Sequence, residues 1–186
     1  MSVNMQIVAL IVGCDPGVAG AIAFLTTEGK LLAVEDIPVD RTQVGKHARS
    51  KVSIPRLLSL LRGAEDARFF VEEPEFRPMM KRNAQTGEVE KTQMGVAGAG
   101  AFGITYGCIA ACAVASGCAL FEVRARVWKS AIGLRGGKED SRRMAANLFP
   151  AQAGLFARVM DHNRAEAALI AYWGLRDMRG ERRVAQ

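Results

Sequence analysis

The sequence lacks the cysteine and histidine spacings that usually mark a structural zinc site. It has four cysteines and two histidines, with no CxxC pair and no histidine at zinc spacing from a cysteine. Small buried thiols are the better interpretation of the four cysteines, which are Cys14, Cys108, Cys112 and Cys118.

The chain also lacks internal repeats and the length for a second large domain. Its 186 residues and 20.1 kDa correspond to one ordinary domain. We expect that domain to span residues 1–178, with a short basic tail over residues 179–186.

No compositional extreme is present that would mark a disordered, collagen-like or disulfide-stapled chain. Hydrophobic residues make up 49% and charged residues 24%, which is ordinary for a globular protein. The sign of the charge is less ordinary, because 25 Lys and Arg face 19 Asp and Glu, a net charge of +6. A polyanionic partner, either nucleic acid or an acidic membrane surface, is favoured.

Neither a signal peptide nor a membrane span is the better interpretation of the two apolar stretches. The segment from Met1 to Cys14 has no basic start and leads directly into Asp15, so we interpret it as a strand. The run from Met94 to Phe121 has no charge, but its six glycines make it poorly apolar for a membrane. We expect a buried Gly/Ala-rich helix followed by a strand, no membrane, and a reducing cytoplasm.

The hydrophobic pattern predicts strands first and then alternating helices and strands. Polar composition predicts loops over 40–51 and 74–93. The expected strands are Gln6–Cys14, Gly20–Thr26, Leu31–Val39, Arg68–Glu72 and Cys118–Val123. One expected helix begins after Ser53, and another ends near Ser116. Three more cover Ala125–Ile132, Glu139–Leu148 and Asn163–Asp177. This order predicts an α/β fold in which helices cover the faces of a mixed sheet.

Four carboxylates fall at element ends on this map. Asp15 ends the first strand, Glu72 ends the fourth, and Asp161 and Glu166 bracket the start of the last helix. If they converge at one sheet edge, they repel one another unless cations bind, and oxygen donors favour Mg²⁺ or Mn²⁺. Two such ions about 4 Å apart would support phosphodiester hydrolysis. Taken singly, Asp15 is also explained as a turn residue, Glu72 as a solvated strand end and Asp161 as a helix N-cap.

Several motifs occur in an order that resembles RuvC-type Holliday-junction resolvases, most closely the bacteriophage and organellar branch. The similarity covers about Ile7 to Gly174. The motifs are Gly13-Cys14-Asp15-Pro16-Gly17, Val71-Glu72-Glu73-Pro74, Phe102-Gly103-x-x-Tyr106-Gly107, Trp128-Lys129, Lys138-Glu139-Asp140-Ser141-Arg142, Leu148-Phe149-Pro150 and Asp161-His162-Asn163-Arg164-Ala165-Glu166-Ala167.

This resemblance implies an RNase H-like five-stranded sheet and cleavage of four-way DNA junctions by a homodimer that uses two Mg²⁺ ions, with Mn²⁺ as a substitute. Asp15, Glu72 and Glu166 match metal-binding carboxylates of the family, with Glu73 the alternative one position on from Glu72.

The fourth ligand does not match the family pattern. In the bacterial proteins it lies three positions before the last carboxylate, and here that position is Asn163. We expect Asp161 to serve instead because it supplies the missing charge, with His162 as the alternative.

Basic residues around the motifs predict contacts to DNA phosphates, and a solvated positive face is the alternative. Small residues at Ala99, Gly103 and Gly107 fit either tight packing on the sheet or a dimer contact. The candidate DNA-binding residues are Arg77, Lys81, Arg82, Arg124, Arg126, Lys129, Lys138 and Arg142.

Two other functions stay open. Asn163 is compatible with a protein that binds branched DNA but cleaves it poorly. The turn from Asp15 to Gly20 also resembles the phosphate-binding hairpin of sugar kinases and actin-like ATPases, although the chain has no second glycine-rich phosphate loop. We expect the protein in the cytoplasm or nucleoid of a bacterial or phage-infected cell, with an organelle also possible.

Overall fold

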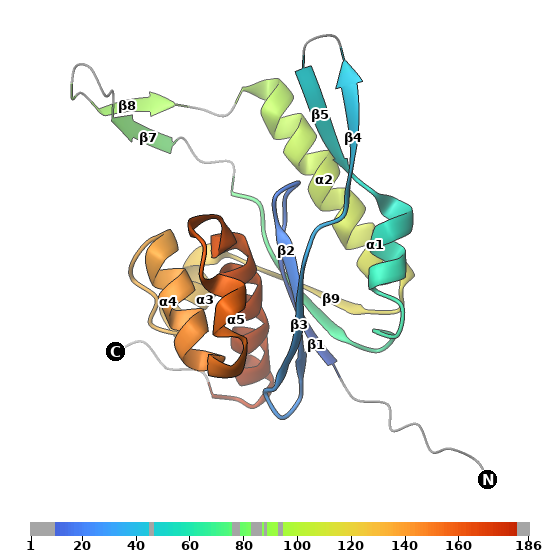
Figure 1. Cartoon of the computed structure of the whole chain (residues 1–186), viewed down its shortest axis with the longest axis vertical. Coiled ribbons are helices and arrows are strands. Elements are labelled where there is room, and N and C mark those ends of the chain that lie inside the picture. The colour runs from blue at the N-terminus through green and yellow to red at the C-terminus, as the bar shows by residue number, and fades with distance from the viewer. Residues whose placement is uncertain are drawn as a thin grey trace.

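A mixed five-stranded sheet forms the centre of the protein, in the order β3-β2-β1-β6-β9 (Figure 1). The computed structural model describes residues 10–44, 47–75, 79–82, 87, 89–92 and 95–181. The first three strands are antiparallel, and the last two run parallel to β1. The predicted fold class is therefore confirmed. The strands are β1 (Leu10–Asp15), β2 (Ala21–Thr26), β3 (Leu31–Asp36), β6 (Arg68–Glu72) and β9 (Ala119–Val123).

Helices cover both faces of this sheet (Figure 1). One face carries α1 (Ile54–Leu60) and α2 (Val96–Ala115). The other carries α3, α4 and α5, and two 3₁₀ segments, η1 and η2, connect α4 to α5. Their bounds are Ala125–Ala131 for α3, Lys138–Leu148 for α4, Pro150–Phe156 for η1, Val159–Asp161 for η2 and His162–Met178 for α5.

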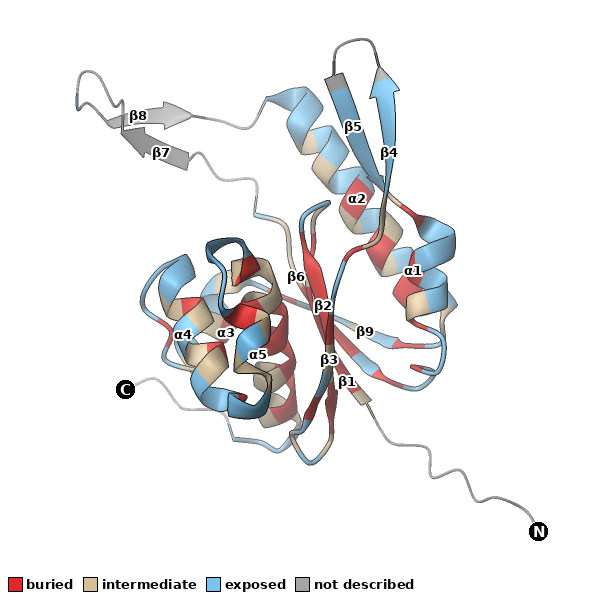
Figure 2. Ribbon diagram, viewed as in Figure 1, coloured by how far each residue is buried: buried red, intermediate tan, exposed pale blue. Residues whose placement is uncertain are grey.

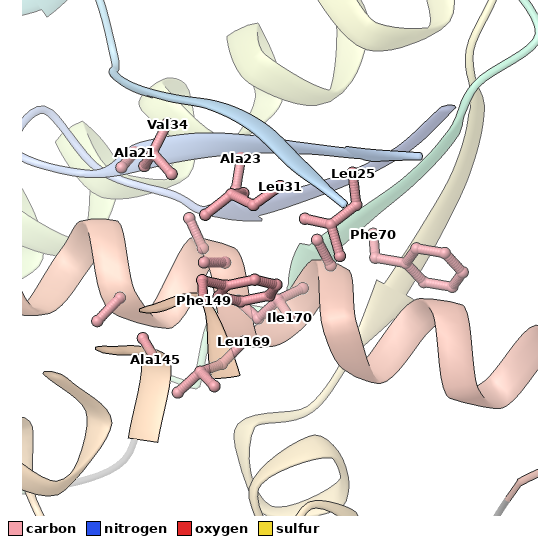
Figure 3. Packing of buried hydrophobic residues seen from close by; sticks show 14 of the residues in the cluster. Ala21, Ala23, Leu25, Leu31, Val34, Phe70, Ala145, Phe149, Leu169 and Ile170 are labelled. Atoms are coloured by element: carbon pink, nitrogen blue, oxygen red, sulfur yellow. The ribbon is translucent and has the colours of Figure 1, made fainter. Parts of the chain in front are cut away.

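Alternate residues of the central strands enter two separate hydrophobic cores, because successive side chains point to opposite faces. Ile11 and Phe70 belong to the core under α5, whereas Val12 and Val71 belong to the core under α1 and α2. Figure 2 shows the central strands buried, and Figure 3 shows Phe70, Leu169 and Ile170 in the α5 core. Burial on both faces explains why β1 is a continuous apolar run.

A close backbone contact joins β1 to α5. A Cβ atom on Gly13 would lie 2.3 Å from the carbonyl oxygen of Ala167 and 2.3 Å from the backbone nitrogen of Ala171. Glycine on the strand and alanines on the helix let the two backbones touch. This contact places the first turn of α5 beside the end of β1.

Two expected loops contain β-ribbons instead, so the prediction of loops was wrong there. Strands β4 (Val39–Val44) and β5 (His47–Val52) pair antiparallel, as do β7 (Met79–Arg82) and β8 (Val89–Thr92). Both ribbons project from the body of the protein in Figure 1. Residues 40–43 of β4 and 48–51 of β5 are exposed and mostly polar. They lack the alternation of apolar and polar residues that marks a half-buried strand, so their composition is that of a loop.

Helix α2 is more exposed than predicted. Within the helix only Thr105, Ile109, Cys112 and Ala113 are buried, and much of its surface is exposed in Figure 2. Gly103 and Gly107 face open space, so the small-residue stripe does not pack on the sheet. In length and mean hydropathy, 1.6, the helix could cross a membrane, which for one such helix is weak evidence.

Candidate active site

The ends of β1 and β6 bring two carboxylates to one edge of the sheet. Cys14 and Val71 are register partners in this parallel pair, so the next residues, Asp15 and Glu72, lie side by side. They point to the same face as Ile11 and Phe70, towards α5. On that helix Glu166 lies one turn after the start.

Glu72 and Glu166 are close enough to Asp15 for their charges to act on it. Burial raises the pKa of Asp15 well above its ordinary 3.8, and the negative charges of Glu166 and Glu72 raise it further. Lys129 and Lys138 act in the opposite direction. Burial is also the main cause of the raised pKa of Glu72. The structure therefore brings together three of the four predicted carboxylates.

Each of two carboxylates in this group accepts hydrogen bonds from α3 or α4. The Lys129 Nζ lies 3.1 Å from Oε2 of Glu166, and the Ser141 Oγ donates to its Oε1 at 3.0 Å. The Trp128 indole nitrogen donates to Oε2 of Glu72 at 2.8 Å. Trp128 is fully buried. No role at the carboxylates was predicted for Trp128 or Ser141, although both lie within the motifs Trp128-Lys129 and Lys138-Glu139-Asp140-Ser141-Arg142.

Glu73, the alternative to Glu72, belongs to the other side of the sheet edge. Because side chains alternate along β6, Glu73 points away from the Asp15 side, and its Oε2 accepts from Arg124 Nε at 2.9 Å. Nearby, the Tyr106 hydroxyl donates to Glu122, and burial followed by this bond raises the pKa of Tyr106. The pairing with Arg124 leaves Glu72, not Glu73, in the carboxylate group.

The structure does not bring Asp161 to this group, contrary to expectation. Its side chain is only 2% exposed and caps η2, where the Arg158 backbone N–H donates to Oδ2 at 2.8 Å. The Arg158 guanidinium donates to Oδ1 at 2.7 Å. These bonds lower the pKa of Asp161, and Asp161 is not among the groups that most strongly shift the pKa of Asp15. A buried carboxylate with a paired arginine is satisfied where it stands.

His162 and Asn163 occupy the first turn of α5 instead. His162 precedes Glu166 by four residues, so both lie on the same side of the helix. Its Nδ1 lies 3.2 Å from the Val159 carbonyl oxygen. The Asn163 amide donates to the Ala19 carbonyl in the turn that follows Asp15. Asn163 therefore ties the turn that follows Asp15 to α5.

The predicted DNA-binding residues differ in how free they are. Lys138 and Arg126 are exposed, Lys129 and Arg124 are paired with carboxylates, and the Arg142 side chain is 11% exposed. Arg142 bonds to Glu139 and to the Phe156 and Ala157 carbonyl oxygens, so it holds η1 against α4 and is not available to a phosphate. Arg77 and the side chains of Lys81 and Arg82 lie outside the described residues.

The donor set suits a hard divalent cation in kind. Three carboxylates at one edge, two of them with raised pKa, supply oxygen donors whose mutual repulsion a cation would relieve. Among the residues that the structure describes, no three His, Cys, Asp or Glu side chains are grouped closely enough to hold a metal ion as they stand. Lys129 on Glu166 and Trp128 on Glu72 occupy two of the oxygens concerned.

The fold is similar to that of solved RuvC structures. RuvC from Thermus thermophilus in complex with a Holliday junction substrate matches at a TM-score of 0.57 and 17% identity, over 94% of this chain and 98% of that chain. A second Thermus thermophilus RuvC structure matches at a TM-score of 0.53 and 15% identity, over 92% and 96%. No protein-family model matches the chain, and no curated protein does. The fold of this protein is therefore RuvC-like.

Proposed function

We propose that this protein is a metal-dependent endonuclease that cleaves branched DNA, with four-way junctions as its main substrate. The observation that carries the proposal is the meeting of Asp15, Glu72 and Glu166 at one sheet edge of a RuvC-like fold. The ordered motifs of the sequence support the bacteriophage and organellar branch of that family. The similar RuvC structure in complex with a Holliday junction substrate supports a branched substrate.

In this proposal Asp15, Glu72 and Glu166 hold two Mg²⁺ ions, with His162 as a fourth donor in place of Asp161. Bound ions of this kind supply an activated water and stabilise the leaving oxygen in phosphodiester hydrolysis. Because the Nδ1 of His162 lies against the Val159 carbonyl, the Nε2 is the nitrogen free to bind. Lys129 pairs with Glu166 in the structure, and its ammonium group would be available to a substrate phosphate if a cation took its place on that carboxylate.

Exposed basic residues next to the carboxylates support DNA as the partner. Lys138 lies close enough to Asp15 to lower its pKa, and Arg126 is exposed on α3. Phosphate contacts from such residues position DNA without reading its sequence. The net charge of +6 has the sign that this partner requires.

A homodimer formed through α2 belongs to the same proposal. Ile104 is 70% exposed on α2, and with Ile54 and Leu58 of α1 it lines an apolar groove of about 390 Å³. Gly103 and Gly107 leave open space on this surface, so a second α2 can approach closely. A second copy fits better than a charged partner, since no charge lies between Met94 and Phe121.

The test is cleavage of a synthetic mobile four-way junction against duplex and single strands of the same sequence, with Mg²⁺ and with EDTA. We expect cleavage of the junction in Mg²⁺ only. Asp15→Asn should lower the single-turnover rate by at least 1000-fold while the protein still binds the junction, because the phosphate contacts remain.

Asp66→Asn is the matched control for Asp15→Asn, because it makes the same substitution at an exposed position. Asp66 lies before the start of β6, at the opposite end of the strand from Glu72. Asn tolerates the positive φ of 64° at this position. Binding without cleavage by the wild-type protein would instead support the junction-binding alternative, which Asn163 keeps open. Cleavage by Asp15→Asn at the wild-type rate would contradict the assignment of Asp15.

A further inference from the structure

The turn that joins α4 to α5 exposes two large apolar side chains next to each other. Among the described residues, the four most exposed large hydrophobic side chains are Val96, Val159, Ile104 and Met160. Val96 and Ile104 lie on α2, in the proposed dimer surface. Val159 and Met160, at 81% and 68% exposed, lie in η2 and are not part of that surface.

The backbone that carries these two side chains is held rigidly. Asp161 closes η2 through Arg158, and its own backbone N–H donates to the Arg158 carbonyl at 3.0 Å. The nearest Arg164 guanidinium nitrogen lies 3.9 Å from the same carboxylate. His162 closes the turn on its other side through the Val159 carbonyl. A buried charge is costly unless paired, and here its effect is to fix the turn that presents Val159 and Met160.

Positive charge surrounds this apolar tip. Val159 and Met160 line a groove of about 620 Å³ together with Lys138, Arg158 and His162. The carboxylate that lines the groove, Glu139, is already paired with Arg142. The groove therefore combines apolar atoms with the exposed Lys138 and with Arg158, which is paired with Asp161 but remains 61% exposed. This combination suits DNA, which has apolar base faces inside a phosphate backbone.

The groove also adjoins the carboxylate group. Lys138 lines it and at the same time lowers the pKa of Asp15. His162 lines it and lies one turn from Glu166 on α5. A DNA strand whose phosphodiester lay at Asp15 would therefore have this groove next to it.

We propose that Val159 and Met160 form an apolar wedge that contacts unstacked bases beside the cleaved phosphodiester, while Lys138 and Arg158 hold the flanking phosphates. The inference rests on the proposed DNA substrate and adds a site that selects branched over linear DNA. Apolar side chains can insert at base steps, and unpaired bases expose their faces at little cost. Linear duplex keeps its bases stacked and gains less from the wedge.

The experiment compares the dissociation constants of a four-way junction and a linear duplex, in EDTA, for wild type and for Val159→Ser with Met160→Ser. The changed side chains are exposed, so the fold is unaffected. We expect junction affinity to fall about tenfold, which corresponds to about 1.4 kcal/mol. Duplex affinity should change less than twofold. Leu32→Thr, an exposed position on β3, is the matched control and should change neither.

A fluorescent base analogue, 2-aminopurine, placed next to the branch point gives a second readout. Its fluorescence should rise when the wild-type protein binds and rise less with the double variant. An unchanged junction-to-duplex ratio in the double variant, or an equal loss for both DNAs, would overturn the wedge. If the wild-type protein did not prefer the junction, the proposed function itself would fail. If the wild type prefers the junction and the double variant keeps that preference, only the wedge fails.

Discussion

A carboxylate is defined by what faces it, and the acidic residues of this protein divide on that basis. Asp15 is buried and lies near two other carboxylates, and both conditions raise its pKa. A bound cation would therefore stabilise its charged form. Asp161 is surrounded by Arg158 and Arg164, which lower its pKa, so it needs nothing further. The two look alike in the sequence, each beside a turn or helix start. Only their partners in the folded chain distinguish the proposed catalytic carboxylate, Asp15, from the structural one, Asp161.

This division predicts the ranking of Asp161 and His162 in cleavage. Asp161→Asn should keep single-turnover cleavage at saturating protein within about tenfold of wild type. It should lower the free energy of unfolding by about 1–3 kcal/mol, because one charged hydrogen-bond acceptor is lost from a buried site. His162→Ala should lower the cleavage rate at least 100-fold with little change in stability. Single-turnover rates in Mg²⁺ and urea unfolding measure the two effects.

The comparison contains its own control, Asn163→Asp, which places a carboxylate at the position that the bacterial family uses. It should restore part of the activity of His162→Ala if the first turn of α5 supplies the fourth donor. An inactive Asp161→Asn beside a fully active His162→Ala would return the ligand role to Asp161.

At the scale of elements, the sequence predicts what is buried and misses what is not. The bounds of β6, α3 and α4 agree with the predictions to within one or two residues, because their apolar pattern follows from a packed face. Residues 40–43 and 48–51 of the β4–β5 ribbon are exposed, so nothing in their pattern distinguished them from a loop. Helix α2 was expected to be buried because its composition is apolar, but composition does not show which surface covers a helix.

The same reasoning applies to the site. Asp15, Glu72 and Glu166 were predictable because strand ends and a helix start converge at one sheet edge. The separation of Asp161 from this group was not predictable. It depends on hydrogen bonds from Arg158, a residue that belongs to no motif. The Trp128 bond to Glu72 joins residues 56 positions apart, and only the folded chain reveals it.

The β1–α5 contact gives the prediction that belongs to this scale. Gly13→Ala should lower the free energy of unfolding by about 3 kcal/mol or more, because the new methyl group would overlap two backbone atoms of α5 that cannot move independently. Gly137→Ala is the matched control, since nothing lies within 4 Å of a Cβ there. Urea unfolding followed by circular dichroism measures both, and equal stability of the two variants would contradict the contact.

At the scale of the whole molecule, two surfaces of different character lie apart from the core. The edge that carries the carboxylates is flanked by Lys129, Lys138 and the cationic groove, and it suits a polyanion. The α2 surface is free of charge and suits a second copy. A four-way junction is cut on two strands, so two such edges held by one α2 interface would make paired cleavage possible.

Ile104→Asp tests that arrangement. A carboxylate on a surface that becomes buried between two helices would lack a partner there, and leaving one charge buried and unpaired costs about 3–5 kcal/mol. We therefore expect the dimer dissociation constant to rise at least 100-fold, so that the variant sediments as a monomer where the wild type sediments as a dimer. Leu32→Asp adds the same charge to an exposed apolar position on β3 and should remain a dimer.

In cleavage, a junction cruciform in a supercoiled plasmid should be linearised by the wild type, since both strands are cut while the DNA is bound. Ile104→Asp should release nicked circles, because each monomer cuts one strand. A monomeric Ile104→Asp that still linearised the plasmid at the wild-type rate would show that pairing of the two cuts does not depend on α2.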